Sequence, residues 1–432
     1  MHTPKLHFEE AIARILAESR AGDRVSEWPI VDAAGLVLAE EIVSDIDAPA
    51  FDRAAMDGYA FRHADARERA TSEGLLVLGA VIAGAAPGML IPDEAGRPGT
   101  GPREPRPFTL GANECVKIMT GAPVPEGADT IIPVEQTSGY VTAGERARFR
   151  DIPERGSHIV SRGQNLRAGE TVLRPGRLLA PAEVALLASV GRVRVRAHAG
   201  PRVAFAATGE ELREPGETLP RGCIRNSNAY NLWAQIRIAR AEPAYLGILP
   251  DRQDVLRERI AAGLEADFLV LSGGVSMGEY DLVTGVLREA GVELRFEKLF
   301  VRPGQPTVFG VRDSGGARTL VFGLPGNPIS TLFAFDQYVA PAMRVFRHHP
   351  QPLATTYRGT LTETVRKKAG NLSLVGCVST WKEDHFELAP TRPQGSSDLA
   401  ATRGIDAIGM ISAEVTEALA GSQIPFRKLH EP

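Results

Sequence analysis

Three glycine-containing turns, each expected to follow a short apolar strand, carry the residue types most able to do chemistry in this sequence. They read Thr-Gly-Glu-Glu-Leu at 208–212, Ser-Gly-Gly-Val-Ser-Met-Gly at 272–278 and Gly-Leu-Pro-Gly-Asn-Pro at 323–328. Glycine lets backbone N–H groups approach an anion closely, and the N-terminus of a following helix favours negative charge. One such turn is as often a tight strand-to-helix connection, but three at one sheet edge favour a phosphate or oxyanion site.

Acidic side chains follow two of these turns. Glu211 comes directly after the first turn, and Glu279 and Asp281 come after the second. Carboxylate oxygens beside phosphate-binding backbone are what a Mg²⁺-nucleotide site requires. Two alternatives stay open: these are solvated loop acids, or Asp281 caps the helix expected from Leu282.

Two cations precede a rigid loop. Lys298 and Arg302 flank Leu-Phe-Val, and Pro-Gly-Gln-Pro follows at 303–306. A cation in this place would hold a phosphate, and an ordinary charged surface turn fits the pattern equally well. Two further segments, 51–60 and 118–129, mix carboxylates, apolar residues and glycines without periodicity, which is typical of functional loops or interfaces.

A parallel sheet would position these residues. Continuous apolar runs alternate with helical patterns between 199 and 348, which is typical of strands buried on both faces. We therefore predict a doubly wound α/β domain over 199–348, whose ligand lies beyond the carboxyl ends of the strands. The expected strands are 203–206, 268–271 and 319–322, and the expected helices are 226–240, 282–290 and a long one from 329.

The remaining chain divides by its patterning. Helical periodicity over 8–16 and 181–190 predicts a helical linker domain made of 1–49 and 155–198. A β-rich module over 50–154 is inserted between these pieces, with an exposed Gly/Pro/Arg-rich loop at 93–112. Short alternating runs after 349 predict a small all-β domain over 349–432, with strands near 357–362, 372–377, 385–389 and 408–411.

Composition excludes several classes of protein. A net charge of −4 and 6% aromatic residues argue against nucleic acid as a partner. No apolar run approaches the ~20 residues of a membrane span, and no signal peptide is recognisable. Three scattered cysteines form neither a metal-ligand pattern nor a disulfide framework. We therefore expect a soluble cytoplasmic protein. The phosphate-binding loop Gly-x-x-x-x-Gly-Lys-Ser/Thr is absent, which disfavours a generic nucleotide hydrolase.

The segments 51–60, 118–129, 208–212, 272–281 and 323–328 resemble, in this order, the signature stretches of molybdopterin molybdenumtransferases, the family that includes MoeA and the E domain of gephyrin. The α/β domain also resembles the smaller molybdopterin adenylyltransferases. The resemblance implies that the α/β domain binds molybdopterin and that the C-terminal domain is a small β-barrel.

The resemblance also implies a reaction and an assembly. Adenylylated molybdopterin and molybdate would enter with Mg²⁺, and molybdenum cofactor and AMP would leave. The protein would be an elongated homodimer, with each active site shared between the α/β domain of one subunit and the inserted module of the other. A molybdopterin adenylyltransferase and factors that mature molybdoenzymes are further expected partners; nucleic acid and membrane are not.

Individual roles follow from matching positions. The resemblance assigns catalysis to Asp57, Thr120, Glu211, Asp251 and Asp281, with Glu211 and Asp281 also binding metal. The residues implied to bind substrate are Gly273, Gly274, Ser276, Lys298, Arg302, Pro325 and Pro328.

The sequence departs from the family pattern at four places. Gln164-Asn165 stands where the family has Glu-Asp, Gln305 where it has lysine, and Asn371 where it has arginine, and the 93–112 loop is longer. These departures leave two alternatives open. One is a divergent paralogue that handles tungstate, and the other is a non-catalytic protein that binds or delivers the pterin cofactor.

Overall fold

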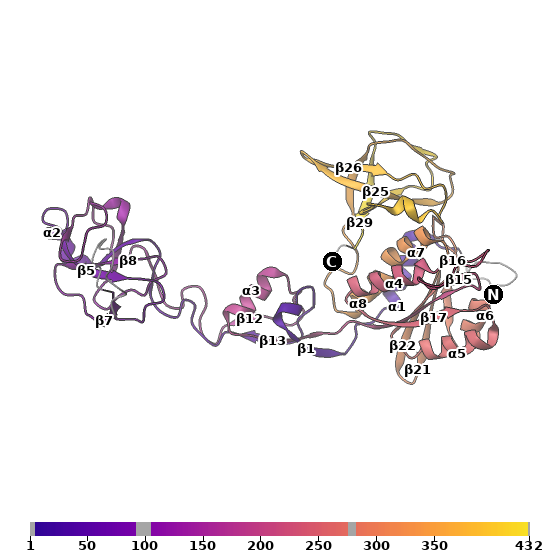
Figure 1. The fold of residues 1–432 in the computed structure, drawn as a ribbon, viewed down its shortest axis with the longest axis horizontal. Helices are drawn as coiled ribbons and strands as arrows, with labels where there is room; N and C mark the ends of the chain where they lie inside the picture. Colours follow the sequence, from indigo (N-terminus) through magenta and orange to yellow (C-terminus); the bar gives the residue numbers. More distant parts are fainter. Residues whose placement is uncertain (1–4, 92–104, 275–281, 431–432) are drawn as a thin grey trace. The chain divides into compact units, whose positions relative to one another are not determined.

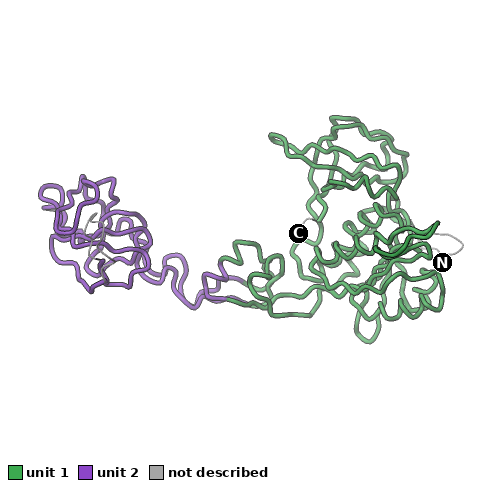
Figure 2. The backbone as a smooth tube through the Cα atoms, viewed as in Figure 1, with its two compact units in different colours: residues 1–40, 174–185, 193–432 green, residues 41–173, 186–192 purple. Residues whose placement is uncertain are grey.

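The structure is a computed structural model that describes residues 5–91, 105–274 and 282–430 (Figure 1). The chain forms two compact units (Figure 2): one contains 1–40, 174–185 and 193–432, and the other contains 41–173 and 186–192. None of the helices within the described ranges has the length and hydropathy needed to cross a bilayer. The boundaries expected for the linker domain and the inserted module stay predictions.

A six-stranded sheet forms the centre of the larger unit. Its first four strands run parallel, and the last two are antiparallel additions at one edge. In spatial order the strands are β17 (Glu242–Leu249), β14 (Arg202–Thr208), β18 (Phe268–Ser272), β22 (Ala317–Leu324), β21 (Val308–Ser314) and β19 (Glu293–Phe296).

Both faces of this sheet are covered by helices. Alternate residues of β14 show why: Phe205 packs in the core on one face, and Ala204 and Ala206 pack in the core on the other. Strands buried on both faces are apolar without interruption, as the sequence predicted. Figure 1 shows α5 and α6 on the opposite side of the sheet from α4 and α8. The helices are α4 (Ser227–Ile238), α5 (Gln253–Gly263), α6 (Leu282–Glu289), α7 (Pro328–Ala334) and α8 (Ala340–Phe346). The doubly wound prediction is confirmed.

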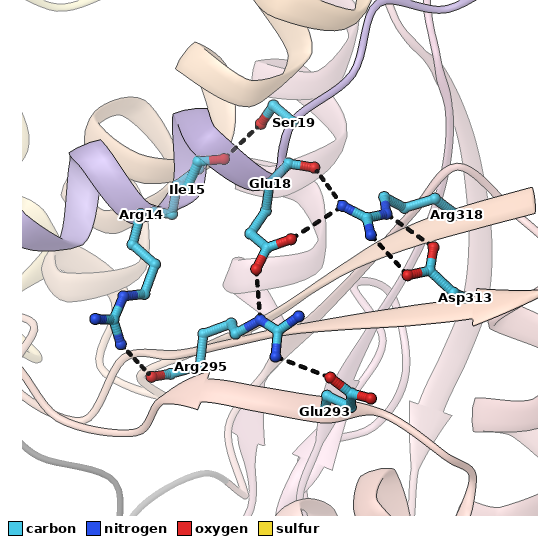
Figure 3. Close-up of polar contacts among 8 residues, drawn as sticks. All are labelled: Arg14, Ile15, Glu18, Ser19, Glu293, Arg295, Asp313 and Arg318. Atoms are coloured by element: carbon cyan, nitrogen blue, oxygen red, sulfur yellow. Dashed lines mark hydrogen bonds and ion pairs between the residues drawn. The ribbon is translucent and has the colours of Figure 1, made fainter.

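Helix α1 (Phe8–Glu18) belongs to the same core. Its buried face, which includes Phe8, Ile12 and Ile15, packs with residues of α7, α8 and the sheet. At the C-terminal end of α1, Glu18 accepts hydrogen bonds from Arg295 at 2.6 Å and Arg318 at 2.9 Å (Figure 3). An α-helix more than 180 residues before β14 in sequence therefore helps to build the α/β fold.

The C-terminal part is a closed five-stranded barrel, as the resemblance implied. Strands follow the order β25-β26-β23-β29-β27, and pairing of β25 with β27 closes the ring. Its core contains Cys377, Leu388 and Phe426. A short strand from the α/β part, β20 (Val301–Arg302), pairs with the start of β25. The barrel strands are β23 (Tyr357–Leu361), β25 (Leu372–Lys382), β26 (His385–Pro390), β27 (Ala407–Ile411) and β29 (Gln423–Lys428), flanked by β24 (Val365–Arg366) and β28 (Glu417–Ala418).

The smaller unit is β-rich, as predicted for this region. Its main sheet has the order β10-β5-β8-β4-β9, with one apolar core around Tyr59 and Phe61 and another around Val116 and Ile118. The strands are β4 (Gly58–Phe61), β5 (Leu75–Val81), β8 (Glu114–Ile118), β9 (Thr130–Pro133) and β10 (Arg146–Ala147). Shorter elements of this unit are β2 (Ile42–Val43), β3 (Arg53–Ala54), α2 (His63–Arg69), β6 (Met89–Leu90), β7 (Arg106–Pro107), β11 (Ile159–Val160) and β12 (Thr171–Leu173).

The larger unit also contains β1 (Val25–Pro29), which pairs with β13 (Arg194–His198), and the boundary between the two units divides helix α3 (Pro181–Ser189).

Candidate active site

Four strand ends meet at one edge of the α/β sheet. Thr208 at the end of β14 is in register with Leu249 of β17, and Ser272 of β18 is in register with Leu324 of β22. Ala207, one residue before Thr208, pairs with Ser272. The three glycine turns therefore emerge side by side, as the strand-and-turn pattern predicted. Asp251, which follows β17, joins them at the same edge.

A cavity of about 750 Å³ lies at this edge. Six of the predicted site residues line it, namely Glu211, Asp251, Gly273, Gly274, Pro325 and Pro328. Thr208 and Ser272, the first residues of two predicted turns, line it as well. The sequence did not point to other lining residues, among them Asn226 and Asn228 from the α/β fold and Ser397 and Leu399 from the barrel part. The position of Asn226 at the start of an expected helix was a usable signal for one of these, whereas no local pattern marks Ser397 or Leu399.

The Ser-Gly-Gly turn needs its glycines for conformation and for space. Gly273 and Gly274 have φ of +92° and +63°, in the left-handed region that disfavours residues with a Cβ. A Cβ on Gly273 would lie 2.8 Å from the carbonyl oxygen of Thr208, and one on Gly274 would lie 2.7 Å from the Thr208 Oγ1. The Gly273 N–H donates to the Leu324 carbonyl, so this particular donor is already engaged. The turn thus wraps closely around the end of β14.

Polar side chains hold the second and third turns together. Asn228 Nδ2 donates to Ser272 Oγ at 2.9 Å and to the Gly326 carbonyl at 2.7 Å. Thr331 Oγ1, from α7, donates to the Pro325 carbonyl at 2.6 Å. These bonds fix the relative positions of two turns that form the wall of the cavity.

The N-terminus of α4 also faces the cavity. Asn226 caps this 12-residue helix by accepting from the Ala229 N–H at 3.2 Å, and Ser227 and Asn228 of the first turn line the cavity. The positive end of the helix dipole therefore favours an anionic group at this wall.

The cavity also carries acidic side chains, which are suited to bind a cation. Burial raises the pKa of Asp251, and the negative charges of Glu211 and Glu210 raise it further. Asp251 and Glu211 both line the cavity, so two carboxyl groups face the same space. Within the described ranges, no three His, Cys, Asp or Glu side chains converge closely enough to enclose a metal ion.

The loop that carries Glu211 is tied to the sheet and to α4. Glu214 accepts hydrogen bonds from Tyr245 at 2.5 Å and Tyr230 at 3.0 Å, and Asn226 donates to the Tyr245 hydroxyl at 2.9 Å. Burial raises the pKa of the Tyr245 phenol, and its bond to Glu214 raises it further, so the phenol keeps its proton as a donor. Short parallel strands β15 (Leu212–Arg213) and β16 (Ile224–Arg225) add backbone pairing within the same loop.

Lys298 and Arg302 lie just before the loop that reaches the cavity. Leu299 and Val301 between them are buried, Lys298 is half-buried, and Arg302 is exposed. Pro306, four residues after Arg302, lines the cavity. Neither predicted cation is among the residues that line the cavity, which this segment reaches through Pro306.

Asp57 and Thr120 contact each other in the smaller unit. Asp57 Oδ1 accepts from the Thr120 N–H at 2.6 Å and from its Oγ1 at 2.7 Å. These hydrogen bonds lower the pKa of Asp57, so its carboxylate is held ionised on an exposed surface. The structure brings this predicted pair together within its own unit.

Two predicted site residues, Ser276 and Asp281, lie outside the described residues, as does Glu279.

The fold and the site together define a molybdopterin-binding protein built on the MoeA plan. A family described as "MoeA N-terminal region (domain I and II)" matches residues 6–191, and one described as "Probable molybdopterin binding domain" matches residues 204–345.

Similar proteins make the assignment specific. The molybdopterin molybdenumtransferase of Haemophilus influenzae is 32% identical over 373 residues, which cover 85% of this chain and 84% of the relative. Molybdopterin molybdenumtransferase 2 of Mycobacterium tuberculosis is 32% identical over 430 residues, covering 95% and 96%. The crystal structure of the molybdopterin biosynthesis MoeA protein from Pyrococcus horikosii has a TM-score of 0.75 at 27% identity, covering 99% of this chain and 100% of that one. The chain belongs to the molybdopterin molybdenumtransferase family.

Proposed function

We propose that this protein is a transferase that inserts molybdate into adenylylated molybdopterin and releases AMP, as a step of molybdenum cofactor biosynthesis in the cytoplasm. The observation that carries the proposal is the cavity where Glu211 and Asp251 adjoin the glycine turns of three parallel strands. A helix N-terminus that favours anions suits the phosphates of the substrate, and the acidic groups beside it suit the divalent cation that accompanies those phosphates. The family of the chain supports the same reaction.

The residues of the cavity would act mainly by position and charge. Gly273 and Gly274 let the second turn pack closely against the end of β14, because a Cβ at either position would clash with Thr208. This close packing would keep the backbone of the turn at the sheet edge where the pterin and its phosphate bind. The first turn of α4, together with Lys298 and Arg302, would stabilise the negative charge that develops as AMP leaves. Pro325 and Pro328 would shape the cavity wall beside the first turn of α4, to which Asn228 ties their turn.

Mg²⁺ fits the donor set of this site. Asp251 and Glu211 both line the cavity, and a divalent cation there would offset the burial and the negative charge of Glu211 that raise the pKa of Asp251. Magnesium commonly binds one or two carboxylates and completes its shell with water and phosphate oxygens, so a three-residue cage is unnecessary. When bound, Mg²⁺ would supply charge neutralisation at the phosphates. Glu211 and Asp251 would hold it, with Asp281 as the further expected ligand.

The proposal includes a homodimer in which Asp57 and Thr120 act on substrate bound by the other copy. This role is supported by the Asp57 carboxylate, which is exposed and ionised and which two hydrogen bonds from Thr120 orient. The test is subunit mixing. Asp57→Ala and Glu211→Ala should each be inactive, and a mixture allowed to exchange subunits should regain part of the activity. A mixture that stays inactive would exclude sharing of the site.

The direct test of the activity is incubation of the purified chain with adenylylated molybdopterin, Mg²⁺ and molybdate, with AMP quantified by chromatography. We expect AMP release that requires both ions and is abolished in Glu211→Ala and Asp251→Ala. Glu383, an exposed acid of the barrel that does not line the cavity, gives the matched control: Glu383→Ala should keep full activity. Pterin binding without AMP release would overturn the transferase proposal.

A further inference from the structure

The segment before α1 adds a lysine to the two predicted anion-binding cations. The Leu6 N–H donates to the Lys298 carbonyl at 3.1 Å, and the Phe300 N–H donates to the Leu6 carbonyl at 2.8 Å. This pairing of two extended segments fixes Lys5 beside the Lys298–Arg302 stretch, although 293 residues separate Lys5 from Lys298 in the chain.

The exposed side of this stretch carries only cations and one aromatic ring. Leu299 and Val301 are fully buried in the core. Lys298 and Phe300 are half-buried, and Arg302 is exposed. The alternation is that of an extended chain with one face on the core, so the other three side chains share the opposite face.

Two contacts hold the Lys5 ammonium over this face. Its Nζ lies 3.9 Å from the centroid of the Phe300 ring and donates to Asn371 Oδ1 at 3.3 Å. The ring and the amide orient the ammonium without neutralising it. Asn371 directly precedes the strand residue that pairs with Val301, so the barrel part fixes one side of the arrangement.

The three positive charges have no acidic partner. Within the described part of the chain, no carboxylate forms an ion pair with Lys5, Lys298 or Arg302. Burial lowers the pKa of Lys5, and the positive charges of Arg302 and Lys298 lower it further. The cations are therefore close enough to repel, and a bound anion would relieve that repulsion.

We propose that Lys5 is an additional anion-binding residue beside the predicted pair Lys298 and Arg302. Its ammonium, positioned by Phe300 and Asn371, would hold a tetrahedral oxyanion together with that pair. An arginine can hold such a group with two parallel hydrogen bonds, and each lysine adds a point charge. The assignment of that oxyanion to the adenylylated pterin rests on the proposed function. The phosphate of that substrate and molybdate are both tetrahedral oxyanions. The loop that follows Arg302 connects this site with the cavity, because Pro306 lines the cavity.

Calorimetric titration of the full chain with pyrophosphate, and separately with molybdate, tests the site without requiring turnover. Lys5→Met should weaken the affinity for at least one probe about tenfold, the loss expected for one partly exposed charge-assisted hydrogen bond. Lys5→Arg should restore most of it. Lys382→Met, which removes the same charge from an exposed barrel position, is the matched control and should bind like the wild type. A larger loss for pyrophosphate assigns the site to a phosphate, and a larger loss for molybdate assigns it to the metal oxyanion.

The positioning role of Asn371 needs its own readout. Asn371→Leu should weaken binding less than Lys5→Met does, and should cause no further loss when combined with it, because both act through the same ammonium. In turnover, Lys5→Met should raise the KM for the adenylylated pterin with kcat nearly unchanged.

The outcomes separate this inference from the proposed function. If Lys5→Met binds both probes as Lys382→Met does, or if the wild type binds neither probe, the oxyanion site is refuted. If the wild type binds a probe through Lys5 yet releases no AMP with substrate, the transferase proposal fails and the oxyanion site stands.

Discussion

Replacing Gly273 by alanine should destabilise the α/β fold by about 2–5 kcal/mol. Its φ of +92° lies in the left-handed region, which costs a residue with a Cβ about 1–2 kcal/mol. The added Cβ would also lie 2.8 Å from the Thr208 carbonyl oxygen and 2.9 Å from its Oγ1. Relieving such an overpacked contact against backbone adds about 1–3 kcal/mol.

Gly291→Ala separates the two contributions. Gly291 has φ of +83°, but no atom lies within 4 Å of the position its Cβ would take. This variant should therefore show only the conformational cost. In a domain of this size about 1 kcal/mol shifts the melting temperature by roughly 2–4 °C. Scanning calorimetry should find a loss of about 4–20 °C for Gly273→Ala and roughly 2–8 °C for Gly291→Ala.

AMP release completes this comparison. Gly273→Ala should lower kcat/KM at a temperature where it is still folded, because the Cβ forces the cavity wall to move, whereas Gly291→Ala should not. Equal melting temperatures in the two variants would refute the argument from close packing around Thr208. Normal kcat/KM in folded Gly273→Ala would show that the turn serves the fold alone.

Other substitutions probe charge. Glu18→Gln should lower the melting temperature by a few degrees in calorimetry, because the partly exposed ion pairs to Arg295 and Arg318 contribute about 1 kcal/mol; an unchanged value would show that they contribute nothing. Asp251→Asn should raise the melting temperature at pH 7 without divalent cations, since the raised pKa of Asp251 penalises its ionised form in the folded state. That gain should shrink as the pH falls through the raised pKa and vanish below the unfolded pKa, where the carboxyl is protonated in both states; a gain independent of pH would contradict this origin. Added Mg²⁺ should raise the melting temperature of the wild type more than that of Asp251→Asn, and equal shifts would remove Asp251 from the cation site.

The sequence predicted the three central parallel strands of the α/β sheet and missed β17, β21 and β19. Phe268–Ser272 is apolar throughout because both of its faces are covered. Glu242–Leu249 lies at the sheet edge, is mostly half-buried, and contains Pro243 and a Gly247 with φ of +92°. An edge strand tolerates proline and glycine, but in a sequence these residues usually indicate that a strand ends. The local pattern therefore did not predict this strand.

The long helix expected from Ile329 is present, but it is not α-helical throughout. The structure has α7, a π-helical stretch over Phe335–Val339, and then α8. Pro341, at the start of α8, lacks an N–H and removes one helical hydrogen bond, which accounts for an irregular stretch just before it. The surrounding residues are apolar and buried, so their pattern continues through the irregular stretch and conceals it.

The sequence predicted which edge of the sheet carries the site, but not all of the residues that form it. Glycine turns after apolar strands indicate where a ligand lies in a doubly wound sheet, and Glu211 could be placed there from its spacing alone. Ser397 and Lys5 could not be placed, because their positions depend on the packing of the barrel part and of the segment before α1 against the α/β fold. No local periodicity encodes contacts between segments so distant in the chain.

The place of α1 in the α/β core has a consequence for biosynthesis. The apolar face with Phe8, Ile12 and Ile15 shares its core with residues of α7 and α8, and the end of α8 at Phe346 lies 328 positions after the end of α1 at Glu18. A ribosome adds about 5–20 residues per second, so this face is made roughly 15–65 s before α8 is complete. Its contacts with the barrel part, such as Arg427 over the Phe8 ring, come later still. The sheet of the smaller unit is complete once Ala147 has been synthesised, and we expect it to fold during that interval. Until the ribosome has passed α8, the face of α1 is an exposed apolar surface of the kind that chaperones shield on nascent chains.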